Sequence, residues 1–260
     1  MIQALLELPA NLRDRLARSL ETGMLRPPFT SAALGAALGA VPGDGVAPAL
    51  DALADKGLTP AAIAAWIRVT AEALKAVPRP ELVWTGPEVP GLHARDTRMV
   101  FDQMLGSAER SLWASTYAYF DGPKAFGVLA ARMDATPELE VTLLLNVGRT
   151  RGETRSREAL VDAFAERFWN RDWPGTRRPR VFYDPRGLEV EASTRSVLHA
   201  KALIQDEEYV LVTSANFTEA ALERNIEVGL RVRDTILARQ LERHFSRLIE
   251  SGELVRLQEA

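Results

Sequence analysis

The sequence contains no cysteine and only three histidines, which excludes several kinds of site at once. Without cysteine the chain can form no disulfide, no thiol nucleophile and no thiolate metal site, and three histidines disfavour a histidine-rich metal centre. No apolar run approaches the roughly 18 residues of a membrane-spanning helix. The first residues, Met1-Ile2-Gln3-Ala4, also lack the basic start of a signal peptide. We therefore expect a cytoplasmic protein with no membrane contact, no metal and no cofactor.

Lysine is scarce as well, because only four of the 32 basic residues are lysines. Nearly all the cations are therefore guanidinium groups, which bind phosphate bidentately. The net charge of −3 argues against a polyanionic partner, but the charge is unevenly spread, with nine arginines against five acidic residues in 149–180. Two explanations stay open, a phosphate-binding surface or a genome that favours arginine.

Helical spacing dominates residues 1–80. Thr30 and Thr59 are suited to cap helices, since a hydroxyl before an apolar-periodic segment accepts from a free backbone N–H. The predicted helices span 31–38, 46–56 and 60–76, after a segment with leucines at positions 5, 6, 8, 12, 16 and 20. We predict a small helical N-terminal region over 1–80, in which helix packing is the first interpretation and a partner-binding module the second.

A segment rich in proline and glycine ends near residue 91, and beyond it short β-rich segments alternate with helical ones. The predicted strands are 82–85, 111–119, 141–147, 180–183, 197–205, 209–213 and 226–232. The predicted helices are 96–108, 124–133, 155–169 and 234–251. This alternation predicts an α/β domain over 81–260, with a sheet covered by helices on both faces.

A histidine and a lysine alternate on the predicted strand 197–205. Because successive side chains of a strand point to opposite faces, His199 and Lys201 should project together. The opposite face is predicted to pack into the core through Leu198, Ala200, Ala202 and Ile204. The next strands add polar groups, Ser214 and Asn216 where one strand ends and Glu227 on the polar face of the other. Together these residues supply a nucleophile, a phosphate clamp and an orienting carboxylate.

The whole constellation resembles the signature of the phospholipase D (HKD) superfamily, HxK(x)4D(x)6GSxN with a glutamate about a dozen residues later. Here the matching residues are His199, Lys201, Asp206, Ser214, Asn216 and Glu227. Thr213 stands where the family has glycine, and a β-branched residue restricts that backbone although it fits the end of a strand. The resemblance covers about residues 82–258 and implies a phospholipase D-like mixed sheet flanked by helices on both faces.

The resemblance also implies a mechanism. His199 Nε2 would attack the phosphodiester to form a phosphohistidine, with its Nδ1–H donated to Glu227. Lys201 and Asn216 would hold the non-bridging oxygens, with Ser214 assisting. Asp206 begins the turn between two strands, so we expect it to support the loop or bind a neighbouring cation.

One motif supplies only one of the two histidines that this mechanism needs. His93 is followed by no lysine at the motif spacing, and His244 lies within a predicted helix with Ser246 at the lysine position. We therefore expect a homodimer in which two copies of His199 meet and share a proton, which gives a bell-shaped pH dependence.

The motif specifies a phosphodiester but not which one. Arginines at 171, 177, 178 and 180 lie among four aromatic residues, Phe164, Phe168, Trp169 and Trp173. Arg171, Arg177, Arg178 and Arg180 are the predicted nucleic-acid contacts. The aromatics either stack on bases or form the apolar face of a helix. We favour a metal-independent nuclease acting on DNA rather than RNA. The alternatives are a weakly catalytic nucleic-acid-binding subunit of a complex, or a phospholipase or phosphatidyl transferase.

A looser resemblance links the chain to the phospholipase D-like proteins of DISARM anti-phage islands. It is carried by the run Trp84-Thr85-Gly86-Pro87-Glu88, by residues 98–108, by Trp113 to Tyr117 and by the helical N-terminal region. It implies a role in antiviral defence, with other defence-system subunits as partners.

Overall fold

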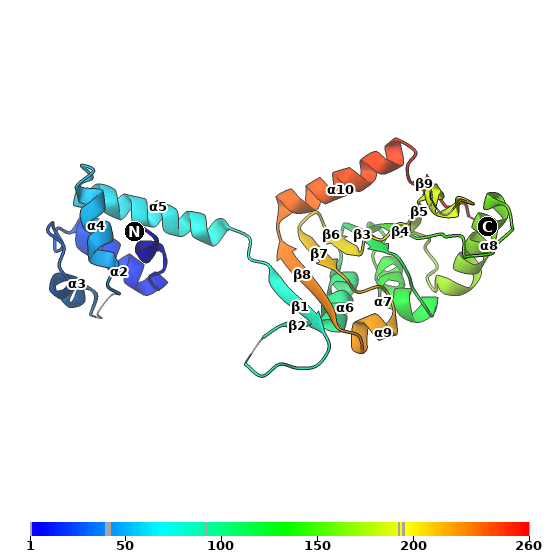
Figure 1. Ribbon diagram of the computed structural model, residues 1–260, viewed down its shortest axis with the longest axis horizontal. Helices are drawn as coiled ribbons and strands as arrows, with labels where there is room; N and C mark the ends of the chain where they lie inside the picture. The colour runs from blue at the N-terminus through cyan, green and yellow to red at the C-terminus, as the bar shows by residue number, and fades with distance from the viewer. Residues whose placement is uncertain (1, 40–42, 92, 192, 194–195, 260) are drawn as a thin grey trace. The chain divides into compact units, whose positions relative to one another are not determined.

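Proline and threonine residues set the helix boundaries of the first unit of the chain, Met1–Pro78. In the computed structural model, Thr30 and Thr59 each accept a hydrogen bond of 3.2 Å from the backbone N–H three residues ahead, which confirms both predicted caps. Pro9 divides the leucine-rich start into two helices. The helices are α1 (Gln3–Leu6), α2 (Ala10–Glu21), α3 (Ser31–Leu38), α4 (Val46–Ala54) and α5 (Pro60–Ala76). The structure describes residues 2–39, 43–91, 93–191, 193 and 196–259 (Figure 1).

Leucine and isoleucine side chains fill the core of this unit. The α2 helix packs against α3 and α5, and α1 and α4 pack against each other and against α5. The most buried side chains are Leu5, Leu16, Leu20, Leu34, Leu38, Leu50 and Ile63. On α5 the buried residues include Ile63 and Ile67, four residues apart, as the periodicity of a helix with one face in the core requires.

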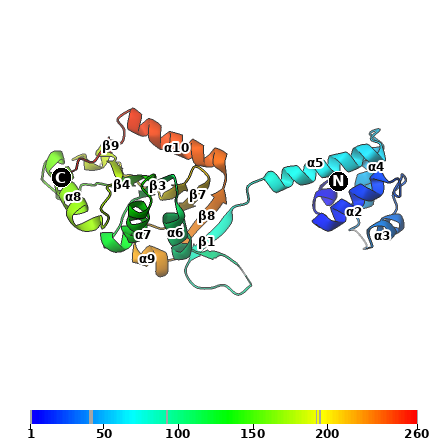
Figure 2. The same cartoon turned by 180° about the vertical axis from the view of Figure 1, so that it is seen from behind.

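A nine-stranded mixed sheet forms the second unit, Arg79–Ala260. Its order is β2-β1-β8-β7-β6-β3-β4-β5-β9, and β3, β4 and β5 run parallel while β6, β7 and β8 run antiparallel to their neighbours (Figures 1 and 2). The strands are β1 (Glu81–Thr85), β2 (Arg95–Asp96), β3 (Ser111–Thr116), β4 (Glu140–Leu145), β5 (Arg180–Tyr183), β6 (Ala202–Gln205), β7 (Tyr209–Thr213), β8 (Glu227–Arg233) and β9 (Val255–Arg256). The helices are α6 (Thr97–Ser107), α7 (Gly122–Ala135), α8 (Arg157–Arg167), α9 (Glu219–Glu223) and α10 (Thr235–Glu250).

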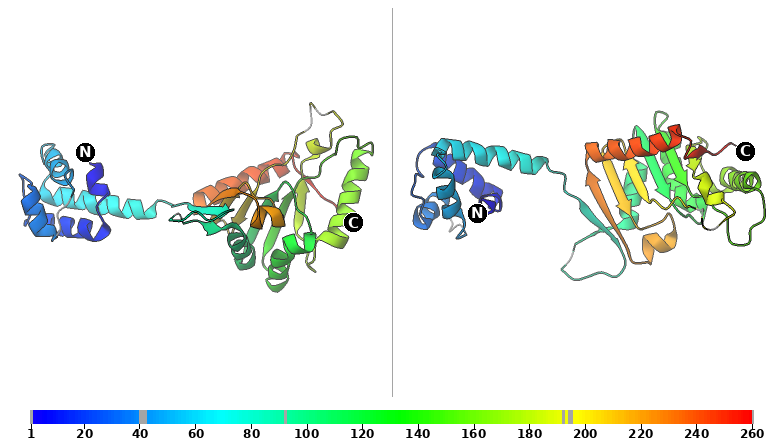
Figure 3. Two further views of the ribbon diagram at one scale, coloured as in Figure 1. Left: turned by 60° about the horizontal axis from the view of Figure 1, so that its bottom comes forward. Right: turned by 45° about the horizontal axis from the view of Figure 1, so that its top comes forward.

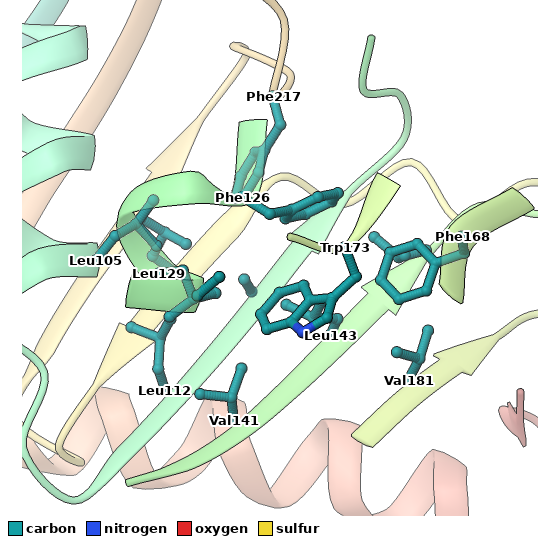
Figure 4. Close-up of a cluster of buried hydrophobic side chains, with 14 of the residues drawn as sticks. Leu105, Leu112, Phe126, Leu129, Val141, Leu143, Phe168, Trp173, Val181 and Phe217 are labelled. Carbon is teal, nitrogen blue, oxygen red and sulfur yellow. The ribbon is translucent and has the colours of Figure 1, made fainter. Parts of the chain in front are cut away.

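Helices cover both faces of this sheet, which confirms the predicted fold class. Side chains from α6, α7 and α8 pack with one face, and those from α10 pack with the other (Figure 3). Aromatic and aliphatic residues interlock in the first core, with Phe126 and Phe168 fully buried beside Trp173 (Figure 4). Within the described residues, no helix is long and apolar enough to span a membrane.

The aromatic residues near position 168 belong to this core. Phe168, Trp169 and Trp173 are buried, and Phe164 packs partly buried against them. Helix α8 continues into a π-helical segment, Phe168–Asp172, which turns these rings toward the sheet. The interpretation of these aromatics as base-stacking groups is therefore wrong, because their faces are covered by the protein itself.

One region of the α10 side of the sheet carries no helix. Alternation places Val212 on the face of Val210, and Leu230 on the face of Val232, yet only Val210 and Val232 are buried beside α10. Cross-strand pairing extends the exposed region through Leu82, Leu230 and Val212, and through Trp84 and Val228. We call these five residues the uncovered sheet face. Leu82, Val212, Val228 and Leu230 are between 43% and 53% exposed.

Candidate active site

The motif residues gather at one end of the sheet, where β3 and β7 finish and β6 and β8 begin. His199 and Lys201 directly precede β6, Ser214 and Asn216 follow β7, and Glu227 is the first residue of β8. Antiparallel pairing of β6 with β3 and β7, and of β8 with β7, brings these strand ends together. We call this the site end of the sheet and the opposite one the far end.

The strand that carries the motif is shorter than predicted. It begins at Ala202 instead of Val197, although the Thr213 N–H still donates to the Lys201 carbonyl at 3.1 Å. Ala200 is exposed rather than in the core, because its backbone lies beyond the covered part of the sheet. Its carbonyl accepts from the Ser115 hydroxyl at 2.9 Å, which fixes the segment in the absence of ladder hydrogen bonds.

The Lys201 ammonium lies directly against the His199 ring. Its Nζ is 3.1 Å from Nδ1 and 3.2 Å from Nε2, and it donates to the His199 carbonyl at 2.9 Å. An ammonium group has only donors, so a hydrogen bond from Lys201 to the ring requires a ring nitrogen that carries a lone pair. Burial lowers the pKa of Lys201, while the charge of Glu227 acts in the opposite direction.

Tyr117 is a site residue that sequence reasoning did not assign to the chemistry. Its ring centroid is 4.9 Å from that of His199, and the Lys201 Nζ is 5.7 Å from the Tyr117 ring. An aromatic face attracts a cation at this distance, so Tyr117 helps to hold Lys201 as well as the imidazole. The sequence signals were its place near the end of a predicted strand and in the run from Trp113 to Tyr117.

The Glu227 carboxylate is held by its own neighbours. The Ser214 hydroxyl donates to Glu227 Oε2 in a short hydrogen bond, and Asn225 Nδ2 donates to Oε1 at 3.0 Å. The Val228 N–H donates to Ser214 Oγ at 3.1 Å, so serine and glutamate form one network. The expected donation from His199 Nδ1 to Glu227 is not among the hydrogen bonds of the described residues, since the imidazole faces Lys201 instead.

Asn216 is oriented by the loop that follows β3. Its Oδ1 accepts from the Ala118 N–H at 3.3 Å. Within the described part of the chain no acceptor is paired with Asn216 Nδ2, so the two N–H groups of the amide are available to a ligand. This is the arrangement that donation to a phosphate oxygen requires.

Thr213, the departure from the family signature, is compensated by Gly229 directly across the ladder. A Cβ on residue 229 would lie 2.9 Å from the Thr213 Cβ, so glycine at this position leaves the room that the threonine side chain occupies. The Thr213 hydroxyl accepts from the Ala215 N–H at 3.0 Å and donates to the Val228 carbonyl at 3.3 Å. Threonine therefore fixes the strand exit on which Ser214 and Asn216 sit.

Asp206 lies at the far end of the sheet, four strand residues away from Lys201. Its carboxylate accepts from the backbone N–H groups of Glu109, Arg110 and Ser111 at 3.1, 2.7 and 3.0 Å. It is buried, and its φ of 56° places it in the left-handed region that aspartate tolerates. Asp206 thus ties the β6–β7 turn to the start of β3 and does not face the site.

Three of the four predicted nucleic-acid contacts also belong to the far end, where β5 begins. Arg177 donates to the carbonyls of Met133, Thr136 and Leu139 at 2.6, 2.8 and 3.4 Å, so its guanidinium closes the end of α7. Arg178 lies 4.9 Å from the Trp169 ring centroid.

The other contacts of these arginines are ionic. Arg178 pairs with Glu259, and Arg180 pairs with Glu140, each at 3.3 Å. Arg171 is exposed on the π-helical segment. Of the four predicted contacts, Arg171 thus differs from the other three, which lie near the start of β5 and have partners within the protein.

A hollow of about 730 Å³ borders the site end beside β1. Apolar residues Leu82, Trp84 and Val89 line it together with His93. The other histidine outside the motif, His244, is exposed on α10. Among the described residues, no three histidine or carboxylate side chains gather as metal ligands.

Comparison with known proteins extends the match beyond the motif. Residues 101–249, more than half of the chain, match the family described as cardiolipin synthase, PLD-like domain. A relative named probable cardiolipin synthase YwiE, from Bacillus subtilis (strain 168), is 24% identical over 173 residues, which are 66% of this chain and 30% of that protein. The chain therefore spans less than a third of this relative's length.

Two solved structures also match part of the chain, and one of them is named as a phospholipase D family member. Nuc from Salmonella typhimurium is 17% identical, with a TM-score of 0.45 over 71% of this chain and 100% of that chain. NucT from Helicobacter pylori is 18% identical, with a TM-score of 0.44 over 67% and 98%. The family match, together with the histidine, lysine and asparagine at the site end, shows that the chain belongs to the phospholipase D-like superfamily of phosphodiesterases and transferases.

Proposed function

We propose that the protein hydrolyses phosphodiester bonds of nucleic acid, DNA in preference to RNA, through a phosphohistidine on His199 and without a metal ion. The observation that carries the proposal is the Lys201 ammonium against the exposed His199 imidazole. A ring nitrogen that carries a lone pair can attack phosphorus, and the adjacent charge of Lys201 offsets the negative charge that builds on the phosphoryl oxygens.

The proposed reaction has two steps, formation of the phosphohistidine and its hydrolysis. His199 Nε2 bonds to phosphorus while the bond to the leaving nucleoside oxygen breaks, and that oxygen takes a proton from a second histidine. Lys201 and the Asn216 amide hold the non-bridging oxygens. Water then bonds to phosphorus, gives its proton to the second histidine and releases His199.

The decisive experiment is incubation of the purified protein with single- and double-stranded DNA and RNA in excess EDTA. We expect cleavage at the same rate as in the presence of Mg²⁺, because the phosphate is held by an ammonium and an amide. Loss of cleavage on chelation, restored by Mg²⁺, would overturn the proposal. Retained DNA binding without cleavage in either condition would favour a nucleic-acid-binding subunit instead.

The second histidine is proposed to come from a second copy of the chain. The uncovered sheet face supports this, because it borders the site end and leaves apolar side chains of three neighbouring strands exposed. Burying it against its two-fold copy would bring two site ends together. We therefore expect Leu230→Asp to be monomeric by light scattering and inactive.

A mixing experiment tests whether the two copies share a site. When wild-type and His199→Ala chains are co-expressed in equal amounts, mixed dimers contain one histidine and are inactive. Activity should then fall to about a quarter of the wild-type value, as the square of the wild-type fraction. A fall to one half, in proportion to that fraction, would show that each chain acts alone.

The wider role that we propose is antiviral defence, with further defence-system subunits as partners. The run from Trp84 to Glu88 and the helical first unit support it through their resemblance to DISARM proteins. Plaque counts on cells that carry the complete defence island, with and without His199→Ala, test it. Equal protection by both would remove the catalytic role in defence.

A second candidate activity is phosphatidyl transfer. The family description and the apolar hollow beside β1 favour it, since Leu82, Trp84 and Val89 offer a surface suited to acyl chains. Phospholipid vesicles incubated with the protein, followed by mass spectrometry of the lipids, separate the two. New phospholipid species in the absence of nucleic-acid cleavage would establish the transferase.

A further inference from the structure

Exposed aromatic side chains are confined to one loop of this protein. The chain has nine phenylalanines, four tyrosines and five tryptophans, all among the described residues. Only Tyr117 and Phe120 are exposed, at 37% and 74%, and every other aromatic ring is buried or half-buried. The two exposed rings lie three residues apart in the loop after β3, and the Tyr117 ring centroid is 4.9 Å from that of His199.

The loop that carries them is firmly anchored. Between the two exposed rings, the Tyr119 hydroxyl donates to Asp172 at 2.7 Å and accepts from Arg167 at 3.1 Å, and the Tyr119 ring packs 5.0 Å from Phe126. Burial, reinforced by Asp172, raises the pKa of Tyr119, so its hydroxyl stays protonated as the donor. Tyr119 also forms a β-bridge with Phe217.

The same loop holds the phosphate-binding amide, because the Ala118 N–H donates to Asn216 Oδ1. The exposed rings are therefore presented at a fixed place relative to both His199 and Asn216. Exposed apolar rings on a rigid support are costly in water, and they are characteristic of a ligand-binding surface.

We infer that Tyr117 and Phe120 form a stacking surface for an unpaired nucleobase beside the scissile phosphate, and that the preferred substrate is single-stranded nucleic acid. The inference rests on the proposed nuclease function and adds the class of substrate. Aromatic rings stack on any base, but a base within a duplex is covered on both faces by its neighbours. Tyr117 beside Lys201, with Phe120 three residues further along the same loop, thus matches the alternating phosphate and base of a single strand.

The test compares a single-stranded oligonucleotide with an abasic strand of the same length, which has the same phosphates and no bases. For the wild type in EDTA, we expect kcat/KM for the base-bearing strand to exceed that for the abasic strand by roughly 5- to 100-fold, the usual strength of one or two stacked bases. Duplex DNA of the same sequence should be cleaved more slowly than the single strand.

Substitutions at Phe120 separate stacking from simple hydrophobicity. Phe120→Ala and Phe120→Leu should both lower the ratio of base-bearing to abasic cleavage toward 1, while Phe120→Trp should keep or raise it. Ile236→Ala is the matched control, since Ile236 is 70% exposed on α10 and follows the far end of β8. It should leave the ratio unchanged.

The outcomes separate this inference from the function on which it rests. A wild type that cleaves both strands equally in EDTA keeps the nuclease proposal and overturns the stacking surface. A Phe120→Ala variant that slows both strands equally, or becomes monomeric by light scattering, also overturns it and indicates a folding or dimer contact. If neither strand is cleaved, the ratio of dissociation constants from fluorescence anisotropy decides, and equal constants overturn the inference.

Discussion

The two ends of the sheet use the same kinds of residue for opposite purposes. At the far end, Asp206 and Arg177 each satisfy three backbone groups, so their charges are consumed within the fold. At the site end, His199 is exposed and the Asn216 amide keeps its donors for a ligand. One short motif thus places its residues in two settings: His199 stays exposed, whereas Asp206 is buried with backbone partners.

His199→Ala should produce the largest loss of activity of any variant, with little change in the stability of the fold. Removing a covalent nucleophile costs about five orders of magnitude or more in turnover, while an exposed side chain contributes little to folding. Cleavage rates in EDTA and thermal melting of the same preparation measure both. His93→Ala is the control, since that histidine lines the neighbouring hollow, and it should retain activity. Comparable losses in the two variants would contradict the assignment.

Asp206→Ala should instead destabilise the fold at the far end of the sheet. Three backbone N–H groups would lose their acceptor, and we expect a loss of about 3 kcal/mol in the free energy of unfolding, measured by urea denaturation. Asp234→Ala, which removes a helix N-cap that accepts from the Ile236 and Leu237 N–H groups, should cost about 1 kcal/mol. A smaller loss for Asp206→Ala than for Asp234→Ala would show that the turn is not held by its carboxylate.

Thr213→Val tests how tightly the strand exit is held at the site end. The variant keeps the shape but leaves the buried Ala215 N–H without an acceptor, which should cost about 1–3 kcal/mol and lower turnover by roughly tenfold through displacement of Ser214 and Asn216. Thr142→Val is the matched control, because the Thr142 hydroxyl is buried with no partner within the described residues. That change should be neutral or slightly stabilising, and Thr213→Ser should restore activity.

The lowered pKa of Lys201 predicts that phosphate binding at the site end depends on pH. Burial lowers its pKa, so the ammonium loses its proton at a lower pH than a free lysine, and phosphate binding should weaken as pH rises through that lowered value. Lys201→Arg keeps the charge throughout this range. Its affinity for the substrate should therefore persist to higher pH than that of the wild type, although its maximal rate is lower because guanidinium geometry differs. Coincident profiles of affinity against pH would exclude Lys201 as the titrating group.

Sequence periodicity predicted the bounds of helices and strands better than it predicted which of their faces other elements cover. Strands β5 and β7 and the caps at Thr30 and Thr59 follow the predicted bounds, because turn residues and hydroxyls act over a few positions. The two-residue strands β2 and β9 carry no period to detect. Alternation identified one face of β8 as apolar, but it could not show that α10 stops short of Val228 and Leu230.

The site was predictable in its residues and less so in its contacts. His199, Lys201 and Asn216 follow from spacing, whereas the partners of Asp206 lie 95 to 97 residues earlier in the chain. Those partners are backbone N–H groups, which leave no trace in residue type. The same is true of Arg177, whose acceptors are carbonyls, so a cluster of arginines was indistinguishable from a phosphate-binding surface.

Arg178→Ala should therefore have the smallest effect, and its position makes it informative. Arg178 is exposed over Trp169 and pairs with Glu259, so its removal should cost less than about 1 kcal/mol of stability. Because it lies at the far end of the sheet, cleavage and DNA affinity should stay at the wild-type level. Arg171→Ala, on the π-helical segment, is the paired variant. Weaker DNA binding by Arg178→Ala than by Arg171→Ala would mean that nucleic acid reaches the far end, and the division between a chemical end and a structural end would then fail.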